Sequence, residues 1–303
     1  MTGLVIYMNG ERGLMTLKRV LEHGYKISAI VVPLNSNIKA NLESNKITRT
    51  LKVLEVSNCN EKDFIDYISF LEPSMAIVAG FPQILSDELV SLPELGTINQ
   101  HGGKLPQYRG GSPLNWQIIN GESIIGVSII KMDSGIDTGA LIYEDSFSLK
   151  DNEDISDAHR KANEIFADLS LRALQALEEG SVELIEQNDT DAVYWHQRNS
   201  DDGLINWNTM NAQQVINMVR ALTRPYPGAY TFRNGDRINI FSASFPSIVI
   251  KGVPGRVCYV QGQGPFVVCS DMAILLHDYV IRDNQQKPIG MQKLRRGDRL
   301  KEY

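Results

Sequence analysis

Short apolar runs alternate, along the first half of the chain, with segments in which apolar residues recur every three or four positions. Residues 3–8, 27–32 and 75–79 are apolar at almost every position, which is typical of strands buried on both faces of a sheet. Residues 14–23 and 62–71 carry the helical period. The order of strand, helix and strand predicts a parallel sheet with right-handed crossovers.

Weaker patterns fill the remainder of this half. A short strand is predicted at 52–56, inside the otherwise polar stretch 35–60. A helix is predicted at 113–120, and further strands are predicted at 123–132 and 140–147. These elements extend the sheet predicted from the stronger runs.

The second half begins with a long amphipathic helix at 154–179, followed by a polar, irregular connection at 189–206 and a shorter helix at 212–222. Short strand-like runs then lie at 230–232, 238–241, 255–260, 265–269 and 272–277. Their spacing predicts a small barrel or an open β-domain. The sequence therefore predicts an α/β protein with a Rossmann-like, mostly parallel sheet and helices on both faces in residues 1–203, and a β-rich, OB-like domain in residues 204–303.

Polar side chains capable of chemistry stand at the ends of two of these runs. Asn99 and His101 are two residues apart at the end of a short apolar run, so a strand would present both to the same side. Asp137 follows in a Gly-rich turn after the strand predicted at 123–132. Because ligands of open α/β sheets bind at the carboxyl ends of strands, these residues predict a site there.

Three motifs surround these residues in a fixed order. They are N-Q-H at 99–101, L-P-Q-Y-R-G at 105–110 and D-S-G-I-D-T-G at 133–139. Together they resemble the formyltransferases that use N10-formyltetrahydrofolate. The resemblance runs over nearly the whole chain, best from about 70 to 230, and is most like the nucleotide-sugar N-formyltransferases, which are related to methionyl-tRNA formyltransferase.

The resemblance implies roles for the three polar residues. Formyl transfer to an amine requires stabilisation of negative charge on the formyl oxygen, removal of a proton from the amine and delivery of one to the leaving nitrogen. His101 is the candidate for the proton work, since an unperturbed imidazole has a pKa of about 6.5. Asn99 would donate to the formyl oxygen, and Asp137 would orient the imidazole or relay a proton. Which of His101 and Asp137 dominates is left open.

The resemblance also implies a formyl donor, N10-formyltetrahydrofolate, and residues that contact it. These cofactor-binding candidates are Phe81, Pro82, Gln83, Ile130, Met132 and Asp133. Two of them have an alternative interpretation, because Pro82 could begin a helix after the strand at 75–79 and Asp133 could order its own loop. No cluster has metal-ligand spacing, so no metal is predicted.

Substrate contacts are predicted from residue chemistry and from the same resemblance. The candidates are Asn9, Arg12, Lys104, Tyr108, Arg109, Arg220, Arg224 and Tyr226. Arg can bind a pyrophosphate bidentately and Tyr can stack on a base, although Arg109 and Arg224 could equally form surface ion pairs. Lys104 departs from the family's usual Ser or Leu beside the L-P pair. The turn at 9–13 lacks a full dinucleotide fingerprint and could be only a tight turn.

Composition bounds the partners and the compartment. The 303 residues carry a net charge of −6, which argues against a dominant nucleic-acid footprint, although residues 251–303 hold nine Lys or Arg against five Asp or Glu. Three cysteines without metal or redox spacing, no signal pattern and no membrane-spanning run predict a cytoplasmic protein that does not bind membranes. The oligomeric state is not fixed, and a homodimer is one option.

Three functions compete at this point. The main prediction is transfer of a formyl group to the amine of a UDP- or dTDP-linked dideoxyamino sugar, which would serve surface-glycan synthesis. The alternative is formylation of initiator methionyl-tRNA, which the acidic balance disfavours because such an enzyme must bind many phosphates. A non-catalytic ligand-binding or assembly module is the third, and the intact Asn99, His101 and Asp137 argue against it.

Overall fold

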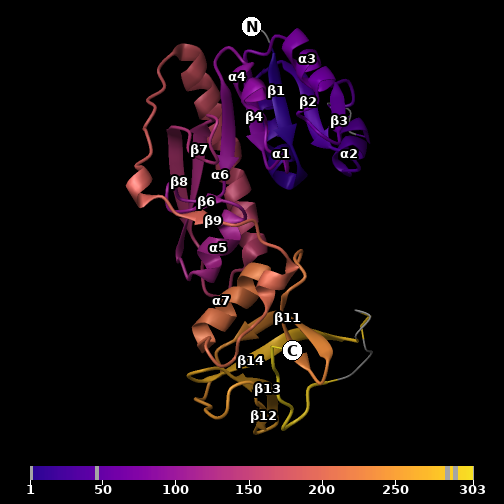
Figure 1. Cartoon of the computed structure of the whole chain (residues 1–303), viewed down its shortest axis with the longest axis vertical. Coiled ribbons are helices and arrows are strands. Elements are labelled where there is room, and N and C mark those ends of the chain that lie inside the picture. Colours follow the sequence, from indigo (N-terminus) through magenta and orange to yellow (C-terminus); the bar gives the residue numbers. More distant parts are fainter. Residues whose placement is uncertain (1–2, 45–47, 284–286, 289–292, 303) are drawn as a thin grey trace. The chain divides into compact units, whose positions relative to one another are not determined.

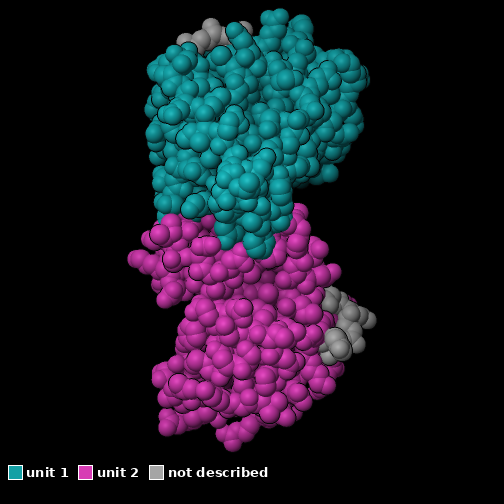
Figure 2. Space-filling model, turned by 60° about the vertical axis from the view of Figure 1, so that its left-hand side comes forward, with its two compact units in different colours: residues 1–113, 126–147, 160–195 teal, residues 114–125, 148–159, 196–303 magenta. Residues whose placement is uncertain are grey.

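The computed structural model describes residues 3–44, 48–283, 287–288 and 293–302. The chain divides into two compact units, which Figure 2 colours separately. The first unit comprises residues 1–113, 126–147 and 160–195, and the second comprises residues 114–125, 148–159 and 196–303. Two internal segments group with the C-terminal part, so a single domain boundary after residue 203 stays a prediction.

The larger sheet has seven strands in the order β3-β2-β1-β4-β5-β7-β8 (Figure 1). The strands are β1 (Leu4–Met8), β2 (Ile27–Pro33), β3 (Val53–Val56), β4 (Met75–Ala79), β5 (Thr97–His101), β7 (Ile124–Lys131) and β8 (Leu141–Ser148). Strands β1 to β5 are parallel to their neighbours, and β7 is antiparallel to β5. Strand β1 is buried along its whole length, as its continuous apolar run predicts. The predicted mostly parallel sheet is confirmed.

Helices connect and follow these strands. They are α1 (Gly10–Glu22), α2 (Ile38–Ser44), α3 (Lys62–Phe70), α4 (Asp87–Ser91), α5 (Pro113–Ile119), α6 (Ile155–Glu179) and α7 (Ala212–Leu222), with two short 3-10 turns, η1 (Asp189–Asp191) and η2 (Ser200–Gly203). No helix in the described part of the chain is long and apolar enough to cross a membrane.

Three helices differ from the sequence prediction. Helix α1 begins at Gly10 rather than at residue 14, because its first turn carries no apolar residue to mark the period. Helix α2 was not predicted in the polar stretch, although Ile38 and Leu42 bury one side of it. Pro82 does not begin a helix, which was the alternative interpretation of that residue. Helix α4 begins at Asp87, where the Ser86 side chain accepts a hydrogen bond from the Leu89 amide.

The second sheet has five antiparallel strands in the order β10-β11-β14-β13-β12. The strands are β10 (Ala229–Arg233), β11 (Asp236–Ser244), β12 (Val257–Val260), β13 (Gln263–Val268) and β14 (Ala273–Arg282). Lys301 pairs with Phe232 of edge strand β10, and Arg299 pairs with Arg256 just before edge strand β12. The C-terminal segment thus joins the two edges, and the predicted β-rich second domain is confirmed with a barrel-like closure.

A two-stranded parallel sheet joins β6 (Arg109–Gly110) to β9 (Tyr194–Trp195). The sequence predicted only an irregular connection over 189–206. In the structure, residues 189–195 of this connection belong to the unit that contains the larger sheet. This short pairing brings the L-P-Q-Y-R-G motif beside residues that follow the long helix α6.

Candidate active site

The side chains of Asn99, His101 and Asp137 meet at the end of β5. Asn99 and His101 are two residues apart on this strand, and Asp137 lies in the turn between β7 and β8. The Asp137 Oδ1 atom is 3.3 Å from His101 Nδ1 and accepts a 3.4 Å hydrogen bond from Asn99 Nδ2. One carboxylate oxygen therefore contacts both other side chains.

The His101 ring is held at both nitrogens. Its Nε2–H donates to the Tyr108 carbonyl oxygen at 2.6 Å, while Nδ1 faces Asp137. Both nitrogens therefore face oxygen atoms, which fixes the orientation of the ring. His101 is only 4% exposed, so these interactions act where water screens them little.

The Asp137 carboxylate is held in its charged form. Burial acts to raise the pKa of Asp137, but the hydrogen bond and charge of His101, the Gly110 amide and the charge of Arg109 outweigh it, so the pKa lies below its usual range. The Gly110 N–H donates to Oδ2 at 2.9 Å. Asp137 itself has a φ of 53°, a left-handed conformation that Asp tolerates better than most residues.

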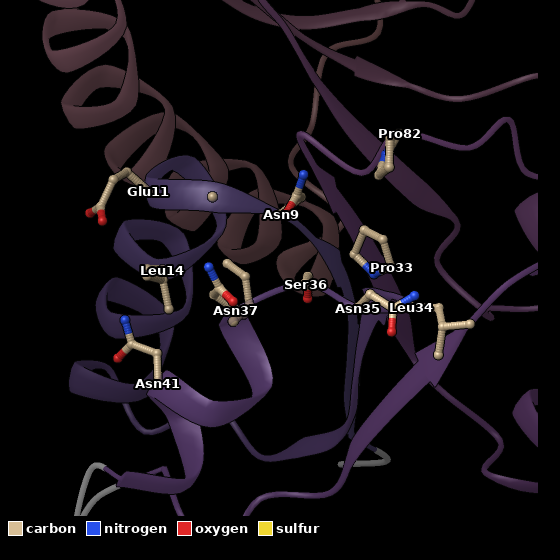
Figure 3. A pocket seen from close by; sticks show the side chains of 12 residues that line it. Asn9, Glu11, Leu14, Pro33, Leu34, Asn35, Ser36, Asn37, Asn41 and Pro82 are labelled. Carbon is tan, nitrogen blue, oxygen red and sulfur yellow. The ribbon is translucent and has the colours of Figure 1, made fainter. Parts of the chain in front are cut away.

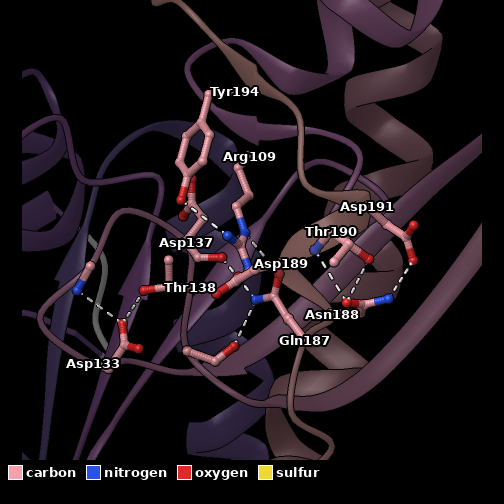
Figure 4. Close-up of polar contacts among 12 residues, drawn as sticks. Arg109, Asp133, Asp137, Thr138, Gln187, Asn188, Asp189, Thr190, Asp191 and Tyr194 are labelled. Atoms are coloured by element: carbon pink, nitrogen blue, oxygen red, sulfur yellow. Dashed lines mark hydrogen bonds and ion pairs between the residues drawn. The ribbon is translucent and has the colours of Figure 1, made fainter.

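Gln187 supports this turn from outside the motifs (Figure 4). Its Nε2 donates to the main-chain carbonyl oxygens of Asp137 at 2.8 Å and Gly139 at 2.7 Å. Its Oε1 accepts from Arg109 Nε at 3.0 Å. A single amide thus links the turn that carries Asp137 to the arginine of the L-P-Q-Y-R-G motif.

Arg109 is a buried anchor of this network. Besides Gln187, its guanidinium donates to Tyr194 Oη at 3.0 Å and to Asp189 Oδ1 at 2.8 Å (Figure 4). The residue is 2% exposed. All three nitrogens therefore donate inside the protein, and the ion pair with Asp189 is the alternative that the sequence left open. A contact of Arg109 with a pyrophosphate stays a prediction.

A pocket of about 570 Å³ opens at the same edge of the larger sheet (Figure 3). Asn9 and Pro82, which follow β1 and β4, contribute to its wall together with the amides of Asn35, Asn37 and Asn41. Strand β4 lies between β1 and β5, and its Val78 pairs with both Tyr7 and Asn99. Strand β1, which Asn9 follows, and strand β5, which carries Asn99, are therefore about 10 Å apart across the sheet.

Two family models match the chain in succession. The model described as formyl transferase covers residues 34–174, and the model described as formyl transferase, C-terminal domain, covers residues 198–299. A methionyl-tRNA formyltransferase from Syntrophus aciditrophicus is 32% identical over 297 residues, which is 96% of this chain and 94% of the relative. The chain belongs to the formyl transferase family.

Solved structures share the fold of this formyltransferase. An N-formyltransferase from Helicobacter canadensis, in complex with folinic acid and dTDP-3-aminofucose, matches with a TM-score of 0.68 and 17% identity over 91% of this chain and 99% of its own. HypX from Aquifex aeolicus, in complex with tetrahydrofolic acid, matches with a TM-score of 0.68 and 18% identity over 95% of this chain but 45% of its own. The predicted formyltransferase activity is confirmed at the level of the family, whereas the sugar substrate is not.

The segment predicted to contact the formyl donor lies beside Asn99, as the order of strands requires. Phe81 is 8% exposed and packs edge-on against Tyr7, so its ring belongs to the core. The Gln83 amide accepts from the Cys59 N–H and donates to the Ser57 carbonyl, which ties this loop to the neighbouring one. The side chains of Phe81 and Gln83 thus shape the loop, and Pro82 lines the pocket.

The other donor-binding candidates lie on and after β7. Ile130 is buried at 2% exposure, and Met132 packs against the apolar cluster under the sheet. Asp133 Oδ1 accepts from the Gly135 amide at 3.0 Å and from Thr138 Oγ1 at 2.6 Å (Figure 4). Asp133 therefore orders the turn, which is the alternative that the sequence left open.

The substrate candidates of the first unit have different surroundings. Tyr108 is buried and stacks on Trp195 with centroids 5.7 Å apart, so its ring is already covered. Arg12 donates to the Gln100 carbonyl and lies 4.5 Å over the Phe166 ring. Asn9 lines the pocket, and Lys104 is exposed. Of these residues, Asn9 and Lys104 are placed where a bound substrate could reach their side chains.

The remaining candidates belong to the second unit, whereas the Asn99, His101 and Asp137 side chains belong to the first. Arg220 donates to the carbonyl oxygens of Glu153 and Lys150, which closes a local loop. Arg224 pairs with Asp278, and Tyr226 contacts His159. Arg224 and Tyr226 also line a second pocket.

Gln187 is the residue that the sequence failed to indicate. It stands in a polar stretch with no periodicity, so no pattern distinguishes it from its neighbours. The aromatic residues Tyr194 and Trp195 follow it in an otherwise polar connection. They are the one feature of the sequence that could have indicated a packed segment here. Among the described residues, no group of three or more His, Cys, Asp or Glu is placed to hold a metal ion.

Proposed function

We propose that this formyltransferase moves a formyl group from N10-formyltetrahydrofolate to a primary amine at the Asn99, His101 and Asp137 site. The complexes of two related folds with tetrahydrofolic acid and folinic acid support this donor. When bound, it supplies a carbonyl carbon that an amine can attack. The observation that carries the proposal is the contact of an amide, an imidazole and a carboxylate at Asp137 Oδ1 in a member of this family.

Each of the three side chains has one role in this proposal. A primary amide carries two N–H groups, so Asn99 can donate one to Asp137 and direct the other at the formyl oxygen. The charged Asp137 carboxylate accepts a proton from the attacking amine. His101 gives its Nδ1 proton to the leaving nitrogen and recovers one from Asp137 across the 3.3 Å contact.

Methionyl-tRNA is the better supported acceptor. The methionyl-tRNA formyltransferase from Syntrophus aciditrophicus aligns along almost the full length of both chains. The acidic balance that disfavoured this acceptor is confined to part of the chain. Residues 1–195 hold 28 Asp or Glu against 16 Lys or Arg, while residues 196–303 hold 14 Lys or Arg against 8 Asp or Glu. A basic C-terminal part is the charge distribution that a phosphate-rich acceptor needs.

A nucleotide-linked amino sugar is the second candidate. The Helicobacter canadensis N-formyltransferase was solved with dTDP-3-aminofucose and aligns over 99% of its length. The overall charge of −6 also suits a small acceptor better than a large polyanion. A UDP- or dTDP-linked dideoxyamino sugar would bring its amine to the same three side chains.

A direct competition separates the two acceptors. The full chain is incubated with N10-formyltetrahydrofolate that carries a labelled formyl carbon, together with initiator methionyl-tRNA and a panel of UDP- and dTDP-linked dideoxyamino sugars. Mass spectrometry locates the label, and His101→Ala protein serves as the control. Label on the methionyl amine supports the first acceptor. Label on a sugar alone replaces it with the second, and label on neither contradicts both.

A further inference from the structure

A second pocket lies wholly within the second compact unit, on the barrel-like sheet. Its volume is about 450 Å³, within the range of small-molecule sites. Its wall includes Arg224, Tyr226, Arg237, Asn239, Phe241 and Arg282. Three arginines and two aromatic rings therefore line one cavity, and none of its described lining residues is acidic.

Asn239 presents a buried acceptor without a partner in this wall. The residue is 3% exposed, and its Nδ2 donates to the Pro227 carbonyl oxygen at 2.9 Å. That bond fixes the amide, yet Oδ1 is buried and has no hydrogen-bond partner. Native proteins pair almost all such atoms, so the position suits a ligand that brings an N–H or O–H donor.

Arg237 presents the complementary group. Its guanidinium lies 3.5 Å over the Tyr230 ring, which fixes the orientation of the charged plane. The buried Nε has no hydrogen-bond partner. A guanidinium held in place with an unused N–H is suited to an anionic oxygen, and to phosphate above other anions because of its fork geometry.

The third arginine of the wall, Arg224, already has two partners. Arg224 is paired with Asp278 at 2.6 Å and lies 4.0 Å over the Phe241 ring. One of the three positive charges in the wall is therefore balanced by an acid next to the pocket. Arginine and aromatic side chains in one wall suit an anion that also carries a flat ring.

We propose that this pocket binds a nucleoside monophosphate unit. The phosphate contacts Arg237 and Arg282, the base lies against Tyr226, and an N–H of the base donates to Asn239 Oδ1. The biological role of this site rests on the proposed function, because a tRNA and a nucleotide-linked sugar both contain such a unit. Its binding chemistry is independent of formyl transfer and can be measured without it.

Calorimetric titration of the full chain tests the pocket. The ligands are UMP, dTMP, CMP and AMP, with uridine and inorganic phosphate as fragments. We expect at least one mononucleotide to bind, and both fragments to bind on the order of tenfold more weakly or worse, because each lacks half of the contacts. Absence of mononucleotide binding up to about millimolar concentration overturns the proposal, and so does phosphate binding as tightly as the nucleotide.

Variants locate the binding within the chain. Arg237→Met and Asn239→Leu are expected to weaken mononucleotide binding on the order of tenfold to hundredfold, and Arg237→Lys less. Arg256→Met is the matched control, since Arg256 bonds to the Gly297 carbonyl and does not line the pocket. Far-UV circular dichroism confirms that the variants are folded. Wild-type affinity in both folded variants overturns the proposal.

Competition identifies the source of the nucleotide. Displacement of bound mononucleotide by initiator tRNA or by a nucleotide-linked amino sugar supports binding of that molecule at this pocket, and displacement by neither contradicts the proposal. The two proposals fail separately. A chain that formylates an acceptor but binds no mononucleotide refutes the pocket alone, whereas a chain that binds mononucleotides but formylates neither acceptor refutes the proposed function alone.

Discussion

The Gln187 side chain bonds to the main chain of Asp137, while the Asp137 carboxylate contacts other residues. The Gln187 Nε2 atom donates to the Asp137 carbonyl oxygen at 2.8 Å, while the Asp137 carboxylate contacts Asn99, His101 and the Gly110 amide. The same Nε2 also donates to the Gly139 carbonyl oxygen. The position of the carboxylate, in a left-handed turn, therefore depends on a residue that is far away in the sequence.

Substitution of Gln187 tests this dependence. Gln187→Ala removes both donors, and Gln187→Glu removes them while it keeps an acceptor for Arg109. Both variants should lower kcat on the order of tenfold to hundredfold, because a carboxylate displaced by a fraction of an ångström is no longer well placed. Steady-state kinetics across pH 5–9 measures the effect. Asn188→Ala is the control, since that side chain bonds to Thr190 and Asp191 within its own turn. Equal rates for Gln187→Ala and Asn188→Ala would refute the role.

Asn99→Ala should reduce turnover while the protein stays folded. The substitution removes the amide proposed to donate to the formyl oxygen, and the loss of one such donor typically costs about 10²–10³ in rate. Asn99→Gln retains an amide but misplaces it by one methylene, so it should recover little. Single-turnover kinetics gives the rate, and a change in KM with unchanged kcat would move Asn99 from catalysis to binding.

Arg109→Lys separates a structural role from a substrate contact. Lysine keeps the charge but lacks the fork that reaches Gln187, Tyr194 and Asp189 together. We expect a loss of unfolding free energy of about 1–3 kcal/mol, with the KM of the acceptor within about twofold of wild type. Urea unfolding and steady-state kinetics provide the two values. A large rise in acceptor KM with unchanged stability would restore the substrate contact predicted from the sequence.

The stability of the chain should depend on the ionisation of Asp137. The pKa of this carboxyl is lower in the folded chain than in the unfolded chain, where it is about 3.9. Its contribution is therefore complete above about pH 4 and is lost as pH falls through the folded-state pKa. The difference in Tm between wild type and Asp137→Asn should shrink as pH falls from 5 to 3. A difference that stays constant down to pH 3 would contradict the shift.

Much of the fold follows from local patterns, and the failures have local causes. The buried strands β1, β2 and β4 were predictable, because a continuous run of five or more apolar residues is typical of a parallel strand that is buried on both faces. The first turn of α1 was missed because Gly10 and its polar neighbours carry no period. Helix α2 was missed because Ile38 and Leu42 are only two apolar anchors in a polar segment.

The candidate site was predictable where it depends on spacing along one strand. Asn99 and His101 lie two residues apart on one strand, so their side chains point to the same face, and this follows from the sequence spacing alone. The positions of Arg109 and Tyr108 depend instead on residues 187–195, which are distant in the chain and have no pattern of their own. The burial of both side chains could therefore not be predicted from the sequence, and their contact with a substrate stays a prediction.

The most direct test of the central claim is the single-turnover rate of formyl transfer by His101→Ala, measured with saturating N10-formyltetrahydrofolate and whichever acceptor takes the label. If His101 moves the proton on its Nδ1, the variant should keep the circular dichroism spectrum of the wild type and lose on the order of 10²-fold or more in rate. A folded His101→Ala protein that transfers formyl at the wild-type rate would contradict the assignment of this site.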